Sequence, residues 1–173
     1  MKHEDEDTNA SMHSGLRRRI AGIALCIATL AGVPMPSAAT ATLWEYAQFR
    51  DSKSGALQHT VQTKLEYDGA VASLAFVCAR GNLVLTIVAT WPIAAALRYR
   101  FPPESAQWIG GTTPVPSSAV FQGADVRKLF DTALERNELM IRIPGPRTIT
   151  ERTLELDGFA AKAQPLKEAC APK

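Results

Sequence analysis

The chain has 173 residues, 46% of them hydrophobic, with 19 lysines and arginines against 17 aspartates and glutamates and a formal net charge of +2. Its sequence has neither a basic stripe interleaved with aromatics, which argues against nucleic acid as a partner, nor an acidic tail typical of a cation buffer. The length suits one domain with a single hydrophobic core.

A leader-like pattern occupies the first quarter of the chain. Arg17-Arg18-Arg19 precede an apolar run from Ile20 to Val33, and small residues follow it. This order predicts a secretory signal peptide over residues 1–41, cleaved after Ala39 or after Ala41, and a periplasmic protein. A retained membrane anchor is the competing interpretation, but about 14 apolar residues fall short of the roughly 20 that a spanning helix needs. We therefore expect no stable membrane span after cleavage.

The first eleven residues, MKHEDEDTNAS, are acidic and unlike the basic start of a signal peptide. We hypothesise that residues 1–11 are a spurious extension and that translation begins at Met12 rather than Met1. The mass of the N-terminal peptide decides between the two starts.

Cysteine counting predicts one disulfide. Cys26 lies in the apolar run of the leader, so Cys78 and Cys170 are the pair left in an oxidising compartment. The chain-entropy description gives a bond closing about 90 residues roughly 4 to 5 kcal/mol as an upper value. Two unbonded thiols or a two-cysteine metal site are the alternatives. A metal would need more ligands than His59, the one histidine of the mature chain, so we expect no metal and no cofactor.

The mature chain begins with two expected strands, Leu43–Arg50 and Leu57–Glu66, joined by a turn over Asp51–Gly55. The strongest pattern is Ala70–Thr90, where apolar segments flank Arg80-Gly81-Asn82. It predicts a central β-hairpin in which Gly81 or Asn82 takes positive φ.

Period-2 alternation divides this hairpin into two faces. One is predicted to face the core: Leu74, Phe76, Cys78, Leu83, Leu85 and Ile87. The other is less polar than a solvated face usually is: Ser73, Ala75, Val77, Val84, Thr86 and Val88. The hairpin is therefore predicted to lie mid-sheet with cover on both sides.

Further strands and helices are expected after Trp91-Pro92. The strands are Ala96–Phe101, a short edge strand Gln107–Ile109, Glu138–Ile143 and Thr148–Asp157; the helices are Ala124–Arg136 and Gly158–Cys170, the latter interrupted near Pro165. Residues 110–118 are predicted to be a loop. The sum is a mainly β fold over residues 42–173, an antiparallel β-sandwich of about eight strands with one or two short helices and one disulfide.

Several motifs recur in a fixed order along almost the whole mature chain. They are Trp44 with Asp51-Ser52-Lys53, Phe76-Val77-Cys78 before a Gly turn, Leu97–Phe101 followed by Trp108, Leu139–Ile143 before a Pro turn, Thr153–Phe159, and Pro165-Leu166 ahead of Cys170. In this the chain resembles the VasI/TagO-type family of small exported proteins associated with type VI secretion. The resemblance implies the fold, export and the single disulfide, and it implies no catalytic residues.

Catalytic groups are not indicated. His59 lies mid-strand, and the chain has no GxSxG-like elbow, so we expect a partly buried structural histidine, with a pairing to Asp51 left open. One predicted strand face carries three carboxylates: Glu151, Glu155 and Asp157. Paired carboxylates for catalysis or a cation site are two interpretations of this face. A solvated face is favoured, because Ca²⁺ needs more oxygen ligands than one strand presents. We predict that the protein is not an enzyme.

An interaction surface is the remaining site candidate. Arg98 and Arg100 project to one side of a strand and, with Arg142, suit a carboxylate or phosphate; a charged outer face that guards an edge is the favoured alternative. Trp91 and Trp108 beside the 110–118 loop are the best surface for a partner, and a core or loop-packing role for both tryptophans stays open.

These observations predict a non-enzymatic periplasmic accessory or interaction protein whose partner is another envelope or secretion protein. The resemblance suggests type VI secretion as its context. The alternative is an inhibitor of a cell-wall lytic enzyme or of a protease.

Overall fold

Alternating apolar strands build two antiparallel sheets that face one another across the core. The computed structural model describes residues 43–171 except 53, 68 and 145–148. The predicted signal peptide, its cleavage sites at Ala39 and Ala41, and the choice between Met1 and Met12 lie outside these residues. So does most of the turn predicted between the last two strands.

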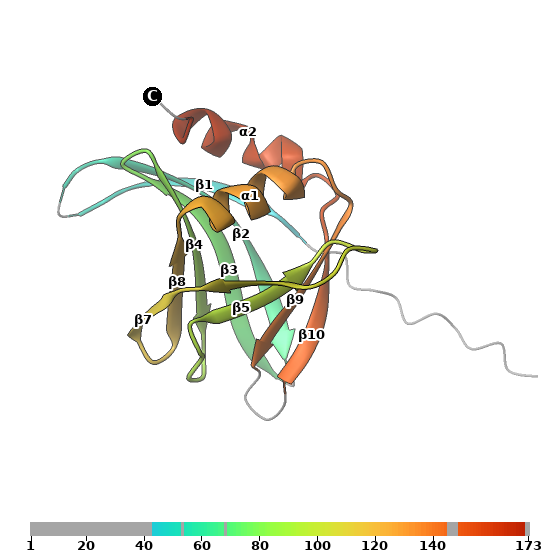
Figure 1. Cartoon of the computed structure of the whole chain (residues 1–173). Coiled ribbons are helices and arrows are strands. Elements are labelled where there is room, and N and C mark those ends of the chain that lie inside the picture. Colours follow the sequence, from blue (N-terminus) through green and yellow to red (C-terminus); the bar gives the residue numbers. More distant parts are fainter. Residues whose placement is uncertain (1–42, 53, 68, 145–148, 172–173) are drawn as a thin grey trace, which may run out of the picture. The chain divides into compact units, whose positions relative to one another are not determined.

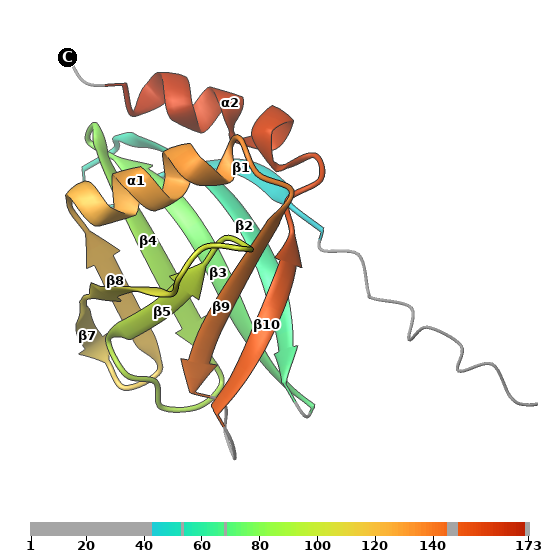
Figure 2. The same ribbon diagram turned by 45° about the vertical axis from the view of Figure 1, so that its right-hand side comes forward.

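The larger sheet has six strands. In spatial order they are β1 (Glu45–Arg50), β2 (Leu57–Tyr67), β3 (Ala70–Ala79), β4 (Asn82–Ala89), β8 (Ser118–Gln122) and β7 (Thr112–Val115). The smaller sheet has four, in the order β10 (Ile149–Glu155), β9 (Glu138–Pro144), β5 (Ala96–Arg100) and β6 (Gln107–Gly110). Figures 1 and 2 show the smaller sheet in front of the larger one. The predicted mainly β, antiparallel two-sheet fold is confirmed.

The central hairpin is confirmed as β3 and β4, in the middle of the larger sheet. Leu74 pairs with Ile87 and Phe76 with Leu85, and all four side chains are buried. The two turn residues, Arg80 and Gly81, have φ of 53° and 79°. Positive φ at both central positions is the geometry of the two-residue turn that matches strand twist, so Arg80 rather than Asn82 is the second left-handed residue.

Two helices lie across one end of the sheets, as Figures 1 and 2 show: α1 (Ala124–Ala133) and α2 (Phe159–Ala169). Helix α1 buries Val126, Leu129, Phe130 and Ala133, the face that the i, i+3, i+4 spacing predicts. Helix α2 is continuous through Pro165, so the predicted interruption is wrong. Its buried residues Phe159, Ala163 and Leu166 hold it in place although Pro165 offers no backbone N–H.

Aromatic rings join the two helices to the larger sheet. The ring centroids of Phe76 and Phe130 are 5.2 Å apart, and those of Phe130 and Phe159 are 5.9 Å apart, both in edge-on contact. Trp44, just ahead of β1, lies edge-on to Phe159 at 4.6 Å and donates a 2.9 Å hydrogen bond from Nε1 to the carbonyl oxygen of Glu155. Trp44 thus connects the start of the larger sheet with the end of the smaller one.

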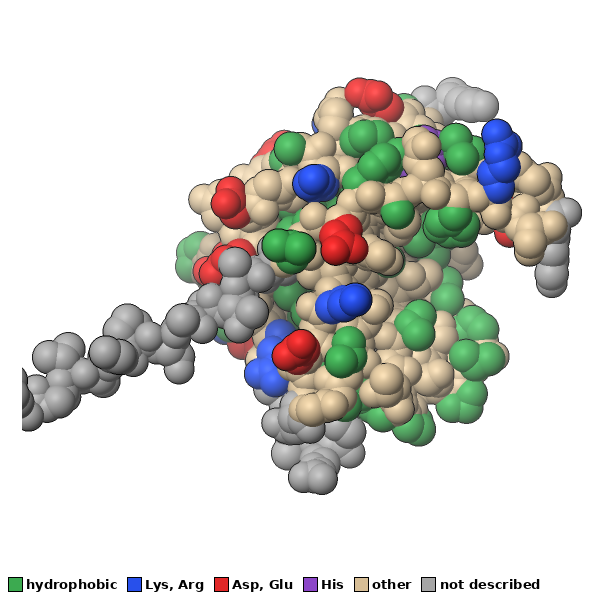
Figure 3. Space-filling model, turned by 180° about the vertical axis from the view of Figure 1, so that it is seen from behind, with side chains coloured by type: hydrophobic (Ala, Val, Ile, Leu, Met, Phe, Trp, Pro, Cys, Tyr) green, Lys and Arg blue, Asp and Glu red, His purple; other side chains and the backbone are tan. Residues whose placement is uncertain are grey.

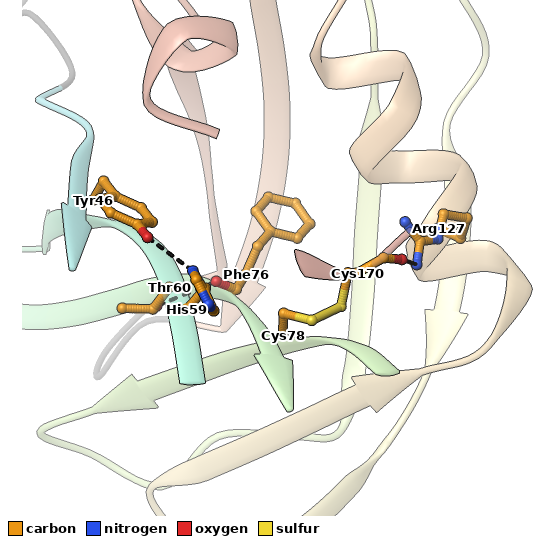
Figure 4. Close-up of a disulfide and its surroundings, with 7 residues drawn as sticks. All are labelled: Tyr46, His59, Thr60, Phe76, Cys78, Arg127 and Cys170. Carbon is orange, nitrogen blue, oxygen red and sulfur yellow. Dashed lines mark hydrogen bonds between the residues drawn. A yellow bond between two sulfur atoms is a disulfide. The ribbon is translucent and has the colours of Figure 1, made fainter. Parts of the chain in front are cut away.

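The predicted disulfide between Cys78 and Cys170 is confirmed (Figure 4). Both cysteines are buried, their Cα atoms are 5.6 Å apart, and 92 positions separate them in sequence. Arg127 of α1 donates a 2.7 Å hydrogen bond from Nη2 to the carbonyl oxygen of Cys170. The end of α2 is therefore fastened both to β3 and to α1. A buried disulfide of this kind is typical of proteins outside the cytoplasm.

The segment predicted as a loop over 110–118 contains a strand, and a second strand follows it. The chain leaves the smaller sheet after β6, passes Gly111, and enters the larger sheet as β7, which pairs with β8. A Cβ on Gly111 would collide with the carbonyl oxygen of Val120 and lie 2.6 Å from the Phe121 ring, so only glycine fits this corner. The glycines and prolines of this segment led to the prediction of a loop. Strand β7 contains a proline nevertheless, because an edge strand tolerates a proline that a central strand does not.

The outer face of β3 and β4 is not covered, contrary to the prediction. Val88 is 51% exposed and Val71 37% exposed, and Figure 3 shows apolar side chains distributed over this side of the larger sheet. The predicted mid-sheet position is right, but no described element packs on this face.

Candidate functional site

One row of side chains crosses all four strands of the smaller sheet on its outer face. Arg98 of β5 lies opposite Trp108 of β6 on one side and opposite Arg142 of β9 on the other. Arg142 in turn lies opposite Glu151 of β10. These residues alternate along their strands with the buried Leu97, Tyr99, Ile109, Ile141 and Leu154. We call this set of four, Trp108, Arg98, Arg142 and Glu151, the Arg98 row.

Trp108 is the most exposed tryptophan among the described residues, with 64% of its surface accessible. The Arg98 guanidinium carbon lies 5.8 Å from the centroid of the Trp108 ring, within cation–π range. A large ring held on a short edge strand by an arginine is a rigid, amphipathic contact surface.

Two arginines of this face have no acidic partner among the described residues. Arg100 forms a salt bridge with Glu151, at 3.0 Å between Nη2 and Oε1. Arg98 and Arg142, directly opposite one another, form none. The Nε atom of Arg98 is buried and has no hydrogen-bond partner within the described chain. The arginines predicted as a group are therefore brought together, but only Arg98 and Arg142 keep their donors available.

Trp91 does not belong to this surface, which corrects the predicted interaction set. It is 7% exposed, its Nε1 donates a 2.7 Å hydrogen bond to the carbonyl oxygen of Pro144, and its ring lies edge-on to Tyr67. Trp91 therefore has the core role that the sequence left open, because its indole N–H finds a partner inside the fold.

His59 is half-buried, as predicted, and is bonded to Tyr46. The Tyr46 hydroxyl oxygen lies 2.8 Å from His59 Nδ1 (Figure 4). Gln48 Nε2 donates to the same hydroxyl at 2.6 Å. The Asp51 carboxylate accepts hydrogen bonds from Ser54 and Gln58. His59 lies opposite Cys78, whose sulfur is in the disulfide, so this pair offers no nucleophile.

Strand β10 and the residues that follow it carry the carboxylates that the sequence grouped as one face. Glu151 bonds Arg100, and the described residues contain no group of three or more His, Cys, Asp or Glu side chains that could hold a metal. The solvated-face interpretation of Glu151 and Asp157 agrees with their exposure.

A second feature, which the sequence did not predict, is a shallow hollow of about 340 Å³ on the outer face of the larger sheet. It is lined by Ala47, Phe49, Thr60, Gln62, Ser73, Ala75, Val77, Thr86 and Val88. Thr60 and Thr86 direct their hydroxyls to the carbonyl oxygens of Phe76 and Ala75, at 3.2 and 3.4 Å. The lining is therefore uncharged, and two of its hydroxyl donors are already engaged by the sheet itself.

Two tyrosines with shifted pKa are buried and do not belong to the exposed Arg98 row. Burial raises the pKa of Tyr67 to about 12, although the charge of Arg152 opposes the shift. Burial also raises the pKa of Tyr99, and the charges of Asp125 and Glu104 add to this. Neither hydroxyl is poised to exchange a proton near neutral pH.

Comparison with known proteins assigns no family to this chain. No family model and no curated protein sequence matches the chain. Among solved structures, the chain is similar to invasion associated protein B from Bartonella henselae, with 13% sequence identity and a TM-score of 0.49 over 75% of this chain and 95% of that one. The resemblance to the VasI/TagO-type family stays a prediction.

Between residues 43 and 171, neither described helix is long and apolar enough to cross a membrane.

Proposed function

We propose that this protein is a non-enzymatic accessory protein of the periplasm that binds another envelope or secretion protein through the Arg98 row. The observation that carries the proposal is the exposed Trp108 ring beside Arg98, with Arg98 and Arg142 lacking acidic partners within the described chain. Tryptophan and arginine are the residues that most often dominate binding energy at protein interfaces.

Two further observations support this function. The buried Cys78–Cys170 disulfide suits an oxidising compartment, as does the leader-like pattern over residues 1–41. The motif order from Trp44 to Cys170 favours a type VI secretion apparatus as the assembly that supplies the partner.

Site-directed photo-crosslinking in the native host tests the proposal. A photoreactive residue replaces Gly110, which is exposed and lies next to the Arg98 row, and where an added Cβ would meet no atom within 4 Å. We expect one discrete envelope or secretion protein to be captured, and Trp108→Ala to abolish the capture. The control position is Lys162, exposed on α2. Capture of the same protein from position 162, or undiminished capture in Trp108→Ala, contradicts the proposal.

An inhibitor of a cell-wall lytic enzyme or of a protease is the second candidate. It is favoured by the exposure of residues 112–116, which follow Trp108 and present Val115 with 53% of its surface accessible. An exposed segment on a rigid sheet can enter an active-site cleft. Inhibition of lysozyme or of a protease that is lost in Val115→Ala and kept in Trp108→Ala would favour this class over the accessory role.

A further inference from the structure

We propose that Arg98 and Arg142 together bind one side-chain carboxylate in an acidic segment of the protein partner, while an apolar side chain of that segment packs on Trp108. This inference rests on the proposed function and adds the chemistry that the partner must present.

The first argument is the register of the two arginines. Arg98 and Arg142 are direct cross-strand neighbours, so their Cβ atoms are about 5 Å apart. Like charges in this position repel one another and destabilise the sheet. A carboxylate between them removes the repulsion and accepts two charge-assisted hydrogen bonds, for which the planar guanidinium is well suited.

The second argument is that the internal acid on this row is already engaged. Glu151 lies opposite Arg142 but places its Oε1 3.0 Å from Nη2 of Arg100. Arg98 and Arg142 form no ion pair with any described residue, and Arg98 Nε is a buried donor without an acceptor there. A buried donor without an acceptor is unfavourable, so the Arg98 guanidinium gains from a nearby carboxylate that its accessible Nη groups can contact.

The third argument concerns the space beside the two arginines. The neighbouring row contains Ala96 opposite Gly110, both exposed, and a Cβ on Gly110 would meet no atom within 4 Å. The backbone of a partner segment can therefore approach the sheet next to Arg98 and reach Trp108 at the edge.

The distribution of charge selects a protein segment over a membrane surface. Arg98, Arg100 and Arg142 share this face with Glu151, and two rows further on Glu138 lies opposite Glu155. Among the described residues, three positive and three negative side chains share this face, so together they carry no net charge that would attract a broad anionic layer. The positive charge without a partner in the described chain is confined to Arg98 and Arg142, which matches a single carboxylate.

The experiment is a nitrogen-15 NMR titration of the purified, disulfide-bonded protein with defined probes. The main probe is the capped tripeptide acetyl-leucyl-glutamyl-leucine amide, and its isosteric glutamine analogue lacks only the charge. Inorganic phosphate and phosphatidylglycerol vesicles are the competing probes. The readouts are the Nε–H signal of Arg98 and the indole N–H signal of Trp108. The indole signals of Trp44 and Trp91, which are hydrogen-bonded inside the fold, serve as internal references.

We expect the glutamate peptide to shift the Arg98 and Trp108 signals and the glutamine peptide to leave them unchanged. Arg98→Lys and Arg142→Lys keep the charge but lose the bidentate hydrogen bonding of the guanidinium. Each should weaken binding of the glutamate peptide about tenfold. Glu151→Gln removes a negative charge beside Arg142 and frees Arg100, so it should strengthen binding of the glutamate peptide. Lys64→Ala, which removes one positive charge from the other sheet, should have no effect.

Equal responses to both peptides would overturn the proposal, as would a response to phosphate or vesicles without one to the glutamate peptide. Unshifted signals with every probe would overturn it too. If these results coincide with crosslinking at position 110 that depends on Trp108, the proposed function stands and only the ligand chemistry is wrong.

Discussion

The guanidinium of Arg152 lies over the ring of Tyr67, with its Cζ 4.7 Å from the ring centroid. Tyr67 is 1% exposed, and neither its hydroxyl nor Nε of Arg152 has a hydrogen-bond partner within the described chain. Burial therefore acts on the Tyr67 hydroxyl without a compensating bond, and this raises its pKa to about 12. The arrangement makes the stability of the fold sensitive to alkaline pH.

Tyr67→Phe should reduce this sensitivity. Above pH 10 the unfolded chain releases the Tyr67 proton while the folded chain retains it, so stability falls as pH rises from 10 to 12. The loss is about 1.4 kcal/mol at pH 11. Urea unfolding at pH 8 and pH 11 measures it. We expect the variant to match or exceed the native protein at pH 8 and to lose less stability at pH 11. An equal loss in both proteins would contradict the assignment to Tyr67.

Removing the disulfide should loosen the C-terminal helix. The double variant Cys78→Ala with Cys170→Ala should lower the free energy of unfolding by up to roughly 4 to 5 kcal/mol, because the bond closes a 92-residue separation. Hydrogen exchange should show the largest loss of protection in α2. Unchanged unfolding and unchanged protection of α2 would show that packing of Phe159 and Leu166 suffices without the bond.

Gly111→Ala should destabilise the fold by about 2 kcal/mol or more, because the new Cβ would collide with the Val120 carbonyl oxygen and the Phe121 ring. Its neighbour offers a matched control: a Cβ on Gly110 meets no atom within 4 Å. Gly110→Ala should therefore change the midpoint of thermal unfolding little. Similar effects of the two substitutions would mean that the corner can shift to accept a side chain.

His59→Ala should lower the stability of the fold and leave binding of the protein partner unchanged. The substitution removes the partly buried hydrogen bond to Tyr46, which is worth about 1 kcal/mol. Crosslinking at position 110 should stay at the native level, because His59 belongs to the other sheet. A turnover measured for the native protein and lost in this variant would return catalysis to consideration.

Local patterns were sufficient to predict the central hairpin, both helices and most strands. Alternate residues of a strand share one face of the sheet, and the more apolar set is expected to face the core. The structure buries this set: Leu74, Phe76, Leu85 and Ile87. The disulfide followed from counting cysteines once Cys26 was assigned to the leader. Strands β7 and β8 were missed because they are short, and Pro114 in β7 resembles a loop residue.

The candidate site depends on pairing between distant segments, which a single sequence does not encode in any local pattern. Arg98 and Arg142 were grouped by residue type, but their direct opposition arises from the β5–β9 pairing. Trp91 and Trp108 were equally good surface candidates, and only tertiary packing buries one ring and exposes the other. The uncovered face of β3 and β4 has the same cause, since alternation cannot tell whether another layer follows.

The contacts of Trp44 bear on when the chain can reach its native state. Trp44 is near the beginning of the described residues, yet it packs on Phe159 and donates a hydrogen bond to the backbone of Glu155. Cys78 likewise forms its disulfide with the distant Cys170. The core is therefore incomplete until residues 155–170 have been synthesised, and contacts between such distant segments form slowly. A nascent chain that lacks its final helix should remain protease-sensitive and capable of threading through a narrow pore.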